Sequence, residues 1–231
     1  MPTLGAVPQE LAPYDLIAEK WSRARGKLLF RERPYVDRFI ALASSGGHVL
    51  DLGCGPGKPI ARSLLDLGYC VTGVDASREM LRLARENCPE AQLIHADMIN
   101  LDLPGPYDGI VAWDSLFHVP RLHHESLFKS FHGWLAPNAP LLLSVGGSGG
   151  EFTDQMFGVD FFYSGHDPDT SVALLRDAGF EIIVAEVDDP SSRGHVAIVC
   201  KNCKKHTRIG SKILADGRTA RTCKKCGNSI E

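Results

Sequence analysis

The sequence lacks the long apolar runs that membrane proteins and secreted precursors carry. No stretch approaches about 18 consecutive apolar residues, so we expect no membrane span. Residues 1–10 contain no basic segment followed by an apolar run, which argues against a secretory signal. The seven cysteines are an odd number, which argues against a disulfide framework and for a reducing compartment. We therefore expect a cytoplasmic protein with no membrane partner.

Charge is unevenly distributed along an otherwise ordinary composition. The chain is 44% hydrophobic and 23% charged, which fits a folded domain rather than a disordered or fibrous chain. Its net charge of −3 combines +7 in residues 201–231, which hold nine Lys and Arg and two acidic residues, with −10 in the residues before them. A basic tail on an acidic body predicts a polyanionic partner for the tail, or simply a solvated, soluble end.

Short apolar runs alternate with segments of helical period after a helical lead-in over residues 1–46. Strands are expected at 48–52, 69–74, 92–95, 109–113, 141–145, 180–186 and 195–200, and helices at 59–67, 77–87, 122–135 and 170–178. This alternation predicts an α/β fold with a doubly wound, mostly parallel, seven-stranded sheet.

Two connections near the end of this pattern carry their own predictions. Residues 188–194 leave no room for a crossover helix, so the last two strands should form a hairpin with one antiparallel strand. The glycine-rich run at 146–150 predicts a flexible loop beside the end of a strand.

A glycine-rich turn at residues 53–57 joins the first predicted strand to the helix after it. Its Gly-x-Gly-x-Gly spacing differs from the Gly-x-Gly-x-x-Gly of dinucleotide-binding proteins. Glycines let the backbone turn tightly and approach a ligand, and the helix N-terminus offers free N–H groups to a carboxylate. Asp51, Asp75 and Asp97 lie at the ends of three strands, where open α/β sheets bind their ligands. Asp75 could accept ribose hydroxyls and Asp97 an adenine amino group, with Met98 packed on the ring face.

These motifs resemble those of class I S-adenosylmethionine (SAM)-dependent methyltransferases. Val49-Leu50-Asp51-Leu52-Gly53-Cys54-Gly55-Pro56-Gly57 is similar to motif I of that family, and Gly109-Ile110-Val111-Ala112-Trp113-Asp114 to its motif IV. The resemblance extends to about residue 201 and implies a Rossmann-like fold, SAM as cofactor and an enzyme of class EC 2.1.1. It also implies a SAM-binding set made of Asp51, Gly53, Cys54, Gly55, Gly57, Asp75, Ala76, Asp97, Met98 and Trp113.

Asp114 and His118 are the candidate catalytic residues, because they follow the fourth strand and should lie near the sulfonium. His118 could act as a general base near neutral pH. It could also order a loop, which is slightly favoured because many such enzymes need no base. Further candidates on the acceptor side are Tyr14, Trp21, Tyr163, Ser164 and His166.

Two motifs of nucleic-acid and amide methyltransferases are missing. Asp114 is followed by Ser-Leu-Phe rather than by the Pro-Pro-Tyr of enzymes that methylate exocyclic amines of bases or glutamine amides. The sequence also has no Pro-Cys pair, so a covalent attack on a pyrimidine ring is unsupported. The short lead-in and the generic middle of the chain therefore resemble small-molecule methyltransferases best.

The C-terminal tail carries two Cys-x-x-Cys pairs separated by nineteen residues. Four thiolates in this pattern favour a tetrahedral, structural zinc, and four free thiols are the alternative. Asp216-Gly217 between the pairs predicts the turn of a β-ribbon. We therefore expect a zinc ribbon with the ligands Cys200, Cys203, Cys223 and Cys226.

The tail also resembles the zinc-bearing end of a bacterial large-subunit ribosomal protein of the KOW class. The similar segments are residues 207–210, 214–218 and 223–227, and the barrel that precedes them in that family is missing. The resemblance implies basic side chains that could meet phosphates.

These observations divide the chain into a helical lead-in or lid (1–46), a SAM-binding domain (47–199) and a zinc ribbon (200–231). Two main functions stay open: a methyltransferase acting on a small-molecule acceptor, or an RNA- or ribosome-associated methyltransferase targeted by its ribbon. A SAM-binding regulator without turnover is a third. The acidic body favours the first function and the basic ribbon the second.

Overall fold

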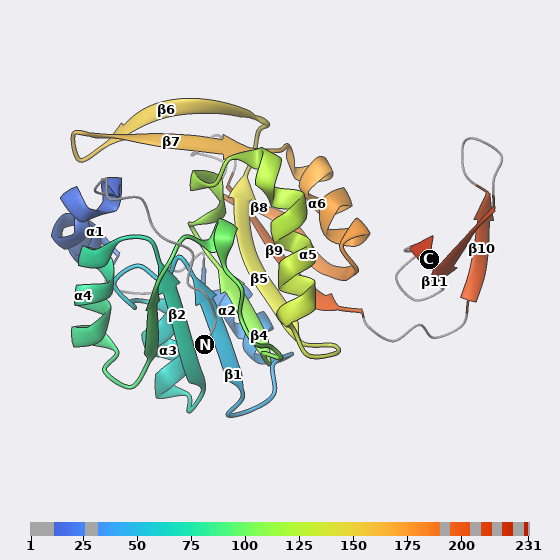
Figure 1. The fold of residues 1–231 in the computed structure, drawn as a ribbon, viewed down its shortest axis with the longest axis horizontal. Helices are drawn as coiled ribbons and strands as arrows, with labels where there is room; N and C mark the ends of the chain where they lie inside the picture. Colours follow the sequence, from blue (N-terminus) through green and yellow to red (C-terminus); the bar gives the residue numbers. More distant parts are fainter. Residues whose placement is uncertain are drawn as a thin grey trace.

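The computed structural model describes residues 12–25, 32–189, 195–203, 209–213, 219–223 and 229–230. Its main feature is a sheet with the strand order β3-β2-β1-β4-β5-β9-β8 and helices on both faces (Figure 1). The strands of this sheet are β1 (His48–Leu52), β2 (Cys70–Asp75), β3 (Gln92–His95), β4 (Gly109–Ala112), β5 (Pro140–Gly146), β8 (Phe180–Asp189) and β9 (His195–Asn202). β9 runs antiparallel to both β5 and β8, whereas the pairs among β1 to β5 are parallel. The predicted seven-stranded, mostly parallel sheet with a terminal hairpin is confirmed.

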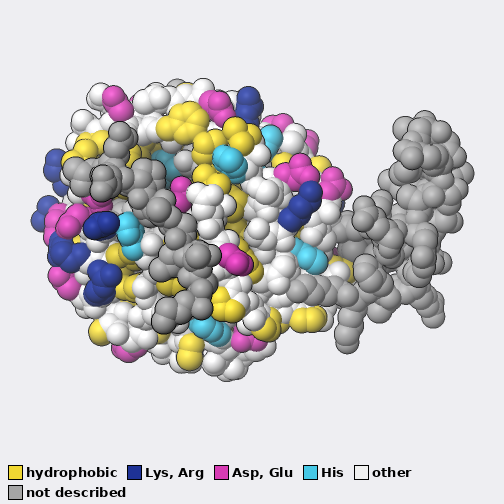
Figure 2. Space-filling view, in the orientation of Figure 1, with side chains coloured by type: hydrophobic (Ala, Val, Ile, Leu, Met, Phe, Trp, Pro, Cys, Tyr) yellow, Lys and Arg dark blue, Asp and Glu magenta, His cyan; other side chains and the backbone are white. Residues whose placement is uncertain are grey.

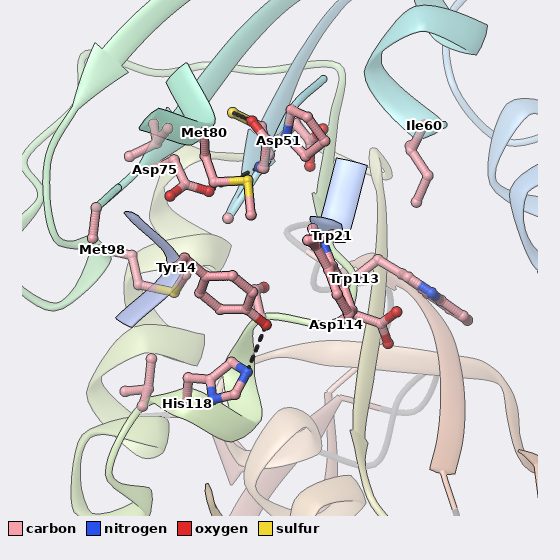
Figure 3. A pocket seen from close by; sticks show the side chains of 18 of the residues that line it. Tyr14, Trp21, Asp51, Ile60, Asp75, Met80, Met98, Trp113, Asp114 and His118 are labelled. Carbon is pink, nitrogen blue, oxygen red and sulfur yellow. Dashed lines mark hydrogen bonds between the residues drawn. The ribbon is translucent and has the colours of Figure 1, made fainter. Parts of the chain in front are cut away.

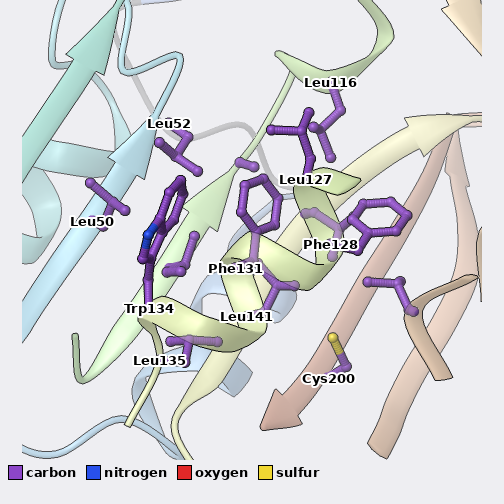
Figure 4. Close-up of a cluster of buried hydrophobic side chains, with 14 of the residues drawn as sticks. Leu50, Leu52, Leu116, Leu127, Phe128, Phe131, Trp134, Leu135, Leu141 and Cys200 are labelled. Carbon is purple, nitrogen blue, oxygen red and sulfur yellow. The ribbon is translucent and has the colours of Figure 1, made fainter. Parts of the chain in front are cut away.

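Each face of the sheet has its own hydrophobic core. On one face, α2 (Arg33–Ile40) and α3 (Ile60–Asp66) cover Val49 and the residues beside it. On the other face, α5 (His124–Trp134) and α6 (Pro168–Asp177) cover Leu50 and Leu52 (Figure 4). Because side chains alternate along a strand, a sheet covered on both faces needs nearly continuous apolar strands. The fully buried Phe128 and Phe131 on α5 each contribute about 1.5–3 kcal/mol through burial.

Caps fix where two of the helices begin. α4 (Arg78–Asn87) starts after Ser77, whose Oγ accepts a hydrogen bond from the Met80 N–H at 3.1 Å. α6 starts earlier than predicted, because the Asp167 side chain accepts from the Thr170 N–H at 2.9 Å. Gly179, with a φ of 106°, follows the end of α6 in the left-handed conformation that favours glycine.

The helical lead-in is confirmed where it is described, as η1 (Pro13–Leu16), α1 (Ala18–Ala24) and α2. η1 is anchored on the start of α4, because Asp15 accepts hydrogen bonds from the Ser77 hydroxyl at 2.6 Å and from the Glu79 N–H at 3.1 Å. Ala18 of α1 packs against Met80 and Leu83 of α4. The lead-in is thereby held close to the carboxyl ends of the first strands.

A β-hairpin that the sequence analysis missed follows β5. It consists of β6 (Gly150–Met156) and β7 (Val159–Gly165), joined at Phe157-Gly158, where both residues have positive φ angles of 53° and 82°. The prediction placed only a flexible loop at 146–150, because β6 is mostly exposed and lacks the apolar alternation of a half-buried strand. β7 contacts η1, β5 and the short helix η3 (Leu116–His118), so the hairpin lies over the end of the sheet (Figure 1).

Hydrophobic side chains gather on the upper part of the molecule, where the hairpin lies (Figure 2). Phe152, Phe157 and Phe162 of the hairpin are each at least 40% exposed. Isolated exposed apolar residues are ordinary, but three phenylalanines on one hairpin indicate a surface that contacts something apolar.

The tail contains the short antiparallel strands β10 (Ile209–Ile213), β11 (Thr219–Cys223) and β12 (Ser229–Ile230). The predicted turn at 216–217 lies outside the described residues, and the zinc ribbon as such stays a prediction. β9 ends at Asn202, beyond the predicted domain boundary at residue 199. In the described ranges, no helix has the length and apolar character needed to cross a membrane.

Candidate functional site

A cavity of about 450 Å³ opens at the carboxyl ends of β1 to β4 (Figure 3). The chain reverses direction across the sheet between β1 and β4, and open α/β sheets bind ligands at such a point. The cavity is lined by all predicted cofactor-binding and catalytic residues except Gly57: Asp51, Gly53, Cys54, Gly55, Asp75, Ala76, Asp97, Met98, Trp113, Asp114 and His118.

The glycine turn lines one side of this cavity. The N–H groups of Gly53 and Cys54 both donate to the Val74 carbonyl oxygen, at 2.8 and 3.0 Å. Gly53 has a φ of 74°, and a Cβ on it would lie 2.4 Å from the Ser115 Cβ. Gly55 has a φ of 54°, and a Cβ on it would meet nothing within 4 Å. The turn therefore needs Gly53 for packing and leaves open space beside Gly55.

Gly57 has a packing role. Its φ is 76°, and an added Cβ would lie 2.8 Å from the Cys88 sulfur at the end of α4. Gly57 does not line the cavity and instead permits close packing between the turn and α4. A direct cofactor contact for Gly57 stays a prediction.

Two carboxyl groups, the buried Asp51 and the half-buried Asp75, line the cavity beside the turn. Asp75 accepts hydrogen bonds from the N–H groups of Gly55 and Ser77, both at 2.8 Å. Burial raises the pKa of Asp75 to about 6, although these two N–H groups oppose the increase. Burial, and secondarily the charge of Asp75, raises the pKa of Asp51 to about 7. A ligand with a cationic group and hydroxyl donors would stabilise the ionised forms of both carboxyls.

The far end of the cavity is formed by Asp97 and Met98. Asp97 accepts a hydrogen bond from the Ile99 N–H at 2.9 Å and so begins the short helix η2 (Met98–Asn100). The thioether groups of Met80 and Met98 both point into the cavity (Figure 3). This combination of one carboxylate with polarisable, apolar groups suits a flat ring that carries an amino group.

A second cavity of about 480 Å³ lies between the hairpin, η3 and the end of β5. Tyr14, Trp21 and Asp114 line both cavities. Of the other acceptor-side candidates, Tyr163 and Ser164 line the second cavity. His166 lines neither cavity, and its ring forms a hydrogen bond with the Arg121 carbonyl. The structure thus has two chambers that meet at three side chains.

His118 is held by hydrogen bonds on both ring nitrogens. Its Nδ1 lies 3.0 Å from the Phe162 carbonyl oxygen, which can only accept, so Nδ1 carries the proton. Nε2 then accepts from the Tyr14 hydroxyl at 2.9 Å (Figure 3). Burial lowers the pKa of His118, so the ring is neutral. Of the two readings of this residue, the geometry favours the one in which it orders the surrounding loops, since it ties η1 and β7 to η3.

Asp114 has the most charged surroundings in the site. Its Oδ2 lies 2.7 Å from the Arg25 guanidinium and its Oδ1 lies 2.9 Å from Nε2 of His195. Its backbone has a φ of 52°, unusual for a residue other than glycine, and its N–H donates to the Ser144 hydroxyl at 2.8 Å. Arg25 also pairs with the buried Glu32.

His195 was not singled out by the sequence analysis, which placed it only at the start of a strand. No local signal could have found it, because its partner lies 81 residues away.

The structure contradicts the prediction for one zinc ligand. Cys200 is fully buried on β9, between β5 and β8, and its thiol packs in the hydrophobic core beneath α5 (Figure 4). Burial raises the pKa of this thiol, which opposes the thiolate that zinc needs. Cys203 is buried just after β9, Cys223 ends β11, and Cys226 lies outside the described residues. The described part of the chain contains no group of three or more His, Cys, Asp or Glu arranged to hold a metal.

The comparisons with known proteins give two separate matches. Residues 49–138 match the family model of a methyltransferase domain, and residues 190–230 match that of the C-terminal domain of the large ribosomal subunit protein uL24. The chain is 33% identical to a ubiquinone biosynthesis O-methyltransferase from Albidiferax ferrireducens over 131 residues, which cover 51% of each chain. It is 44% identical to uL24 from Carboxydothermus hydrogenoformans over 48 residues, which cover 21% of this chain and 45% of that protein.

The fold is that of SAM-dependent methyltransferases. A methyltransferase of this type from Clostridium acetobutylicum superposes with a TM-score of 0.65 at 13% identity, covering 83% of this chain and all of the other. Residues 49–138 therefore match a methyltransferase domain model and lie within this fold. The chain spans only about half the length of the curated methyltransferase named above.

Proposed function

Because residues 49–138 match the model of a methyltransferase domain, we propose that the protein transfers the methyl group of SAM to a small-molecule acceptor. The observation that carries this proposal is the pair of cavities that share Tyr14, Trp21 and Asp114. A donor in one chamber and an acceptor in the other would meet at these side chains, as an in-line displacement requires.

The acceptor groups and apolar side chains that line the first cavity match the groups of SAM. Asp51 would receive the ammonium group, whose charge would favour the ionised form of this buried carboxyl. Asp75 would receive the ribose hydroxyls, while Asp97 and Met98 would contact the adenine ring. SAM supplies a methyl group on a positively charged sulfur. The protein would orient the donor and the acceptor and exclude water from between them.

A small acceptor is favoured by the size and the charge of the second cavity. A volume of about 480 Å³ falls within the range of small-ligand sites. Its described lining residues include five aromatic side chains and no Lys or Arg: Tyr14, Trp21, Phe117, Phe152 and Tyr163. A nucleic-acid substrate would need cationic groups around the acceptor to meet its phosphates.

Methyl transfer from radiolabelled SAM tests this proposal. The purified chain is given either a panel of small aromatic and aliphatic acceptors or structured RNA. We expect label in a small product and none in RNA. Label in RNA alone would overturn the proposal and leave the second function.

The second function is an RNA- or ribosome-associated methyltransferase, and we propose it for the tail because residues 190–230 resemble uL24. Nine Lys and Arg within residues 201–231 could contact phosphates. RNA binding that weakens steeply with salt would support this function, and salt-independent or missing binding would contradict it.

Zinc binding by the tail is part of this second proposal and is tested separately. Because Cys200 is part of the core, a zinc ion held with the sheet intact would have to use Cys203, Cys223, Cys226 and another ligand. Metal analysis of the purified chain, with and without replacement of Cys223 by Ser, decides whether the tail binds zinc.

A further inference from the structure

His195, the first residue of β9, lines the second cavity, which is the proposed acceptor cavity. Its Nε2 lies 2.9 Å from Asp114 Oδ1, and its Nδ1 lies 2.5 Å from Asp188 Oδ1 at the end of β8. The ring packs edge-on against Trp113 and Phe117, with centroid distances of 5.3 and 6.4 Å. His195 is therefore fixed in position by two carboxylates and two aromatic rings.

The partners of His195 determine its protonation. An ionised carboxylate only accepts hydrogen bonds, so a ring that bonds to two of them must carry a proton on each nitrogen. Burial by itself lowers the pKa of His195, but the hydrogen bonds and charges of Asp114 and Asp188 outweigh it and raise the pKa. The charged groups that face this cluster are Asp114 just after β4, Asp188 from β8, and Arg25 from the lead-in, which also pairs with Glu32. The cluster thus alternates anions and cations around Asp114.

One wall of the acceptor cavity is a stack of aromatic rings. The Phe152 and Tyr163 rings are 5.1 Å apart and 11° from parallel, and the Tyr163 and Phe117 rings are 5.9 Å apart and 28° from parallel. The charged side chains of the described lining are Asp114, Asp154 and His195. A flat aromatic wall next to two carboxylates suits a planar molecule and disfavours an anion.

We propose that the acceptor is a planar molecule with an O–H or N–H group and no negative charge, that Asp114 receives the proton of this group, and that His195 is the positioning residue for Asp114. This inference rests on the proposed small-molecule function. In the step, the acceptor atom forms a bond to the methyl carbon while the carbon–sulfur bond breaks and its electron pair goes to sulfur. The acceptor's bond to hydrogen breaks, its electron pair stays on the acceptor atom, and the proton goes to the Asp114 carboxylate.

The geometry around Asp114 fits this role. His195 holds Oδ1 at 2.9 Å and Arg25 holds Oδ2 at 2.7 Å, so the carboxylate has a fixed orientation where the two cavities meet. Two adjacent cations keep the carboxylate ionised before the proton arrives. A residue other than glycine held at a φ of 52° is costly, and such conformations concentrate at functional sites.

His195 lies in the part of the chain that resembles a ribosomal protein. β9 and His195 belong to residues 190–230, the segment that matches uL24, yet β9 pairs with β5 and β8 inside the methyltransferase sheet. The segment similar to a ribosomal protein therefore supplies both a sheet strand and a side chain of the acceptor site.

The class of acceptor is tested by calorimetry on the full chain loaded with S-adenosylhomocysteine. The probes are catechol, aniline and benzoate, which are all planar and offer O–H, N–H and anionic groups. We expect catechol or aniline to bind and benzoate to bind at least tenfold more weakly. Benzoate binding as tightly as the others, or no binding by catechol and aniline, overturns the acceptor class. Failure to bind S-adenosylhomocysteine would count against the proposed function instead.

The role of His195 is tested by methyl transfer to the probe that binds, between pH 6 and 10. Asp114→Asn should lower kcat about 100-fold or more, the usual size of an acid–base contribution. We expect the kcat of wild type to fall at high pH, when the imidazolium of His195 loses its proton. His195→Gln should lower kcat about tenfold and should not show this fall. Asp188→Asn should move that fall to lower pH. His123→Gln, outside both cavities, should match wild type.

Binding of S-adenosylhomocysteine by each variant verifies its fold. A His195→Gln variant with the kcat and pH profile of wild type overturns the positioning role. If His195→Gln does not fold, an unchanged pH profile in Asp188→Asn overturns it.

Discussion

The imidazole Nε2 of His195 lies 2.9 Å from Oδ1 of Asp114, although 81 positions separate the two residues. The contact joins the start of β9 to the last residue of the segment similar to motif IV, just after β4. Because Asp114 also pairs with Arg25 of the lead-in, three distant parts of the chain meet at one carboxylate. The site therefore depends on the sheet being complete through β9.

The His195 pair makes stability depend on pH. The folded-state pKa of His195 is raised above its usual value of about 6.5, so the stabilisation is fully present below that pH. It is lost as the pH rises through the folded-state pKa. We expect the Tm of wild type to fall relative to that of His195→Gln between pH 6.5 and the alkaline range, measured by calorimetry. Parallel Tm curves for the two proteins would contradict the prediction.

Asp75 should contribute directly to SAM affinity. Replacing it by Ala removes a carboxylate that two backbone N–H groups hold in place, and should weaken SAM binding by about 1–3 kcal/mol. Titration calorimetry measures the change. Asp102→Ala, at an exposed carboxylate outside the cavity, is the matched control and should bind like wild type. Equal SAM affinities for the two variants would show that Asp75 does not contribute to SAM binding.

Gly53 and Gly68 both have positive φ angles but differ in the space around them, so their replacement by Ala should differ in its effect. An Ala at position 53 would be strained at a φ of 74° and would place its Cβ 2.4 Å from that of Ser115. The left-handed strain costs about 1–2 kcal/mol and the overpacking about 1–3 kcal/mol more. Gly68→Ala, at a φ of 86° with open space, should show the strain alone. Urea unfolding should therefore rank Gly53→Ala as clearly less stable than Gly68→Ala, and equal losses would contradict the packing argument.

The sheet and the SAM cavity were predictable because their signals are local. The turn at 53–57 and the acids that end neighbouring strands are read from a few residues each, and parallel strands bring such ends together. The packing of Gly57 against Cys88 could not be predicted, because the two residues are 31 positions apart and no local motif joins them. The positive φ of Gly57 serves this packing.

The acceptor side could not be predicted, because its residues come together from distant parts of the chain and carry no local signal. β6 is exposed on both faces and carries no apolar alternation, so the hairpin over the cavity left no periodic signal. His195 acquires its meaning only from Asp114 and Asp188. In the tail a local signal is present, because the Cys-x-x-Cys pattern is typical of metal sites. The structure nevertheless places Cys200 of β9 in the hydrophobic core.

Replacing Cys200 separates its role in the core from the predicted role as a zinc ligand. Its side chain is fully buried among apolar residues, so Cys200→Ser places a hydroxyl there without a matched partner. We expect this to lower the free energy of unfolding by about 1–3 kcal/mol. Because the cause is packing, urea unfolding should show the same loss with and without EDTA. Cys70→Ser, at an exposed cysteine, should leave stability unchanged. A loss that appears only in zinc-containing samples would restore Cys200 as a ligand and require β9 to end before it.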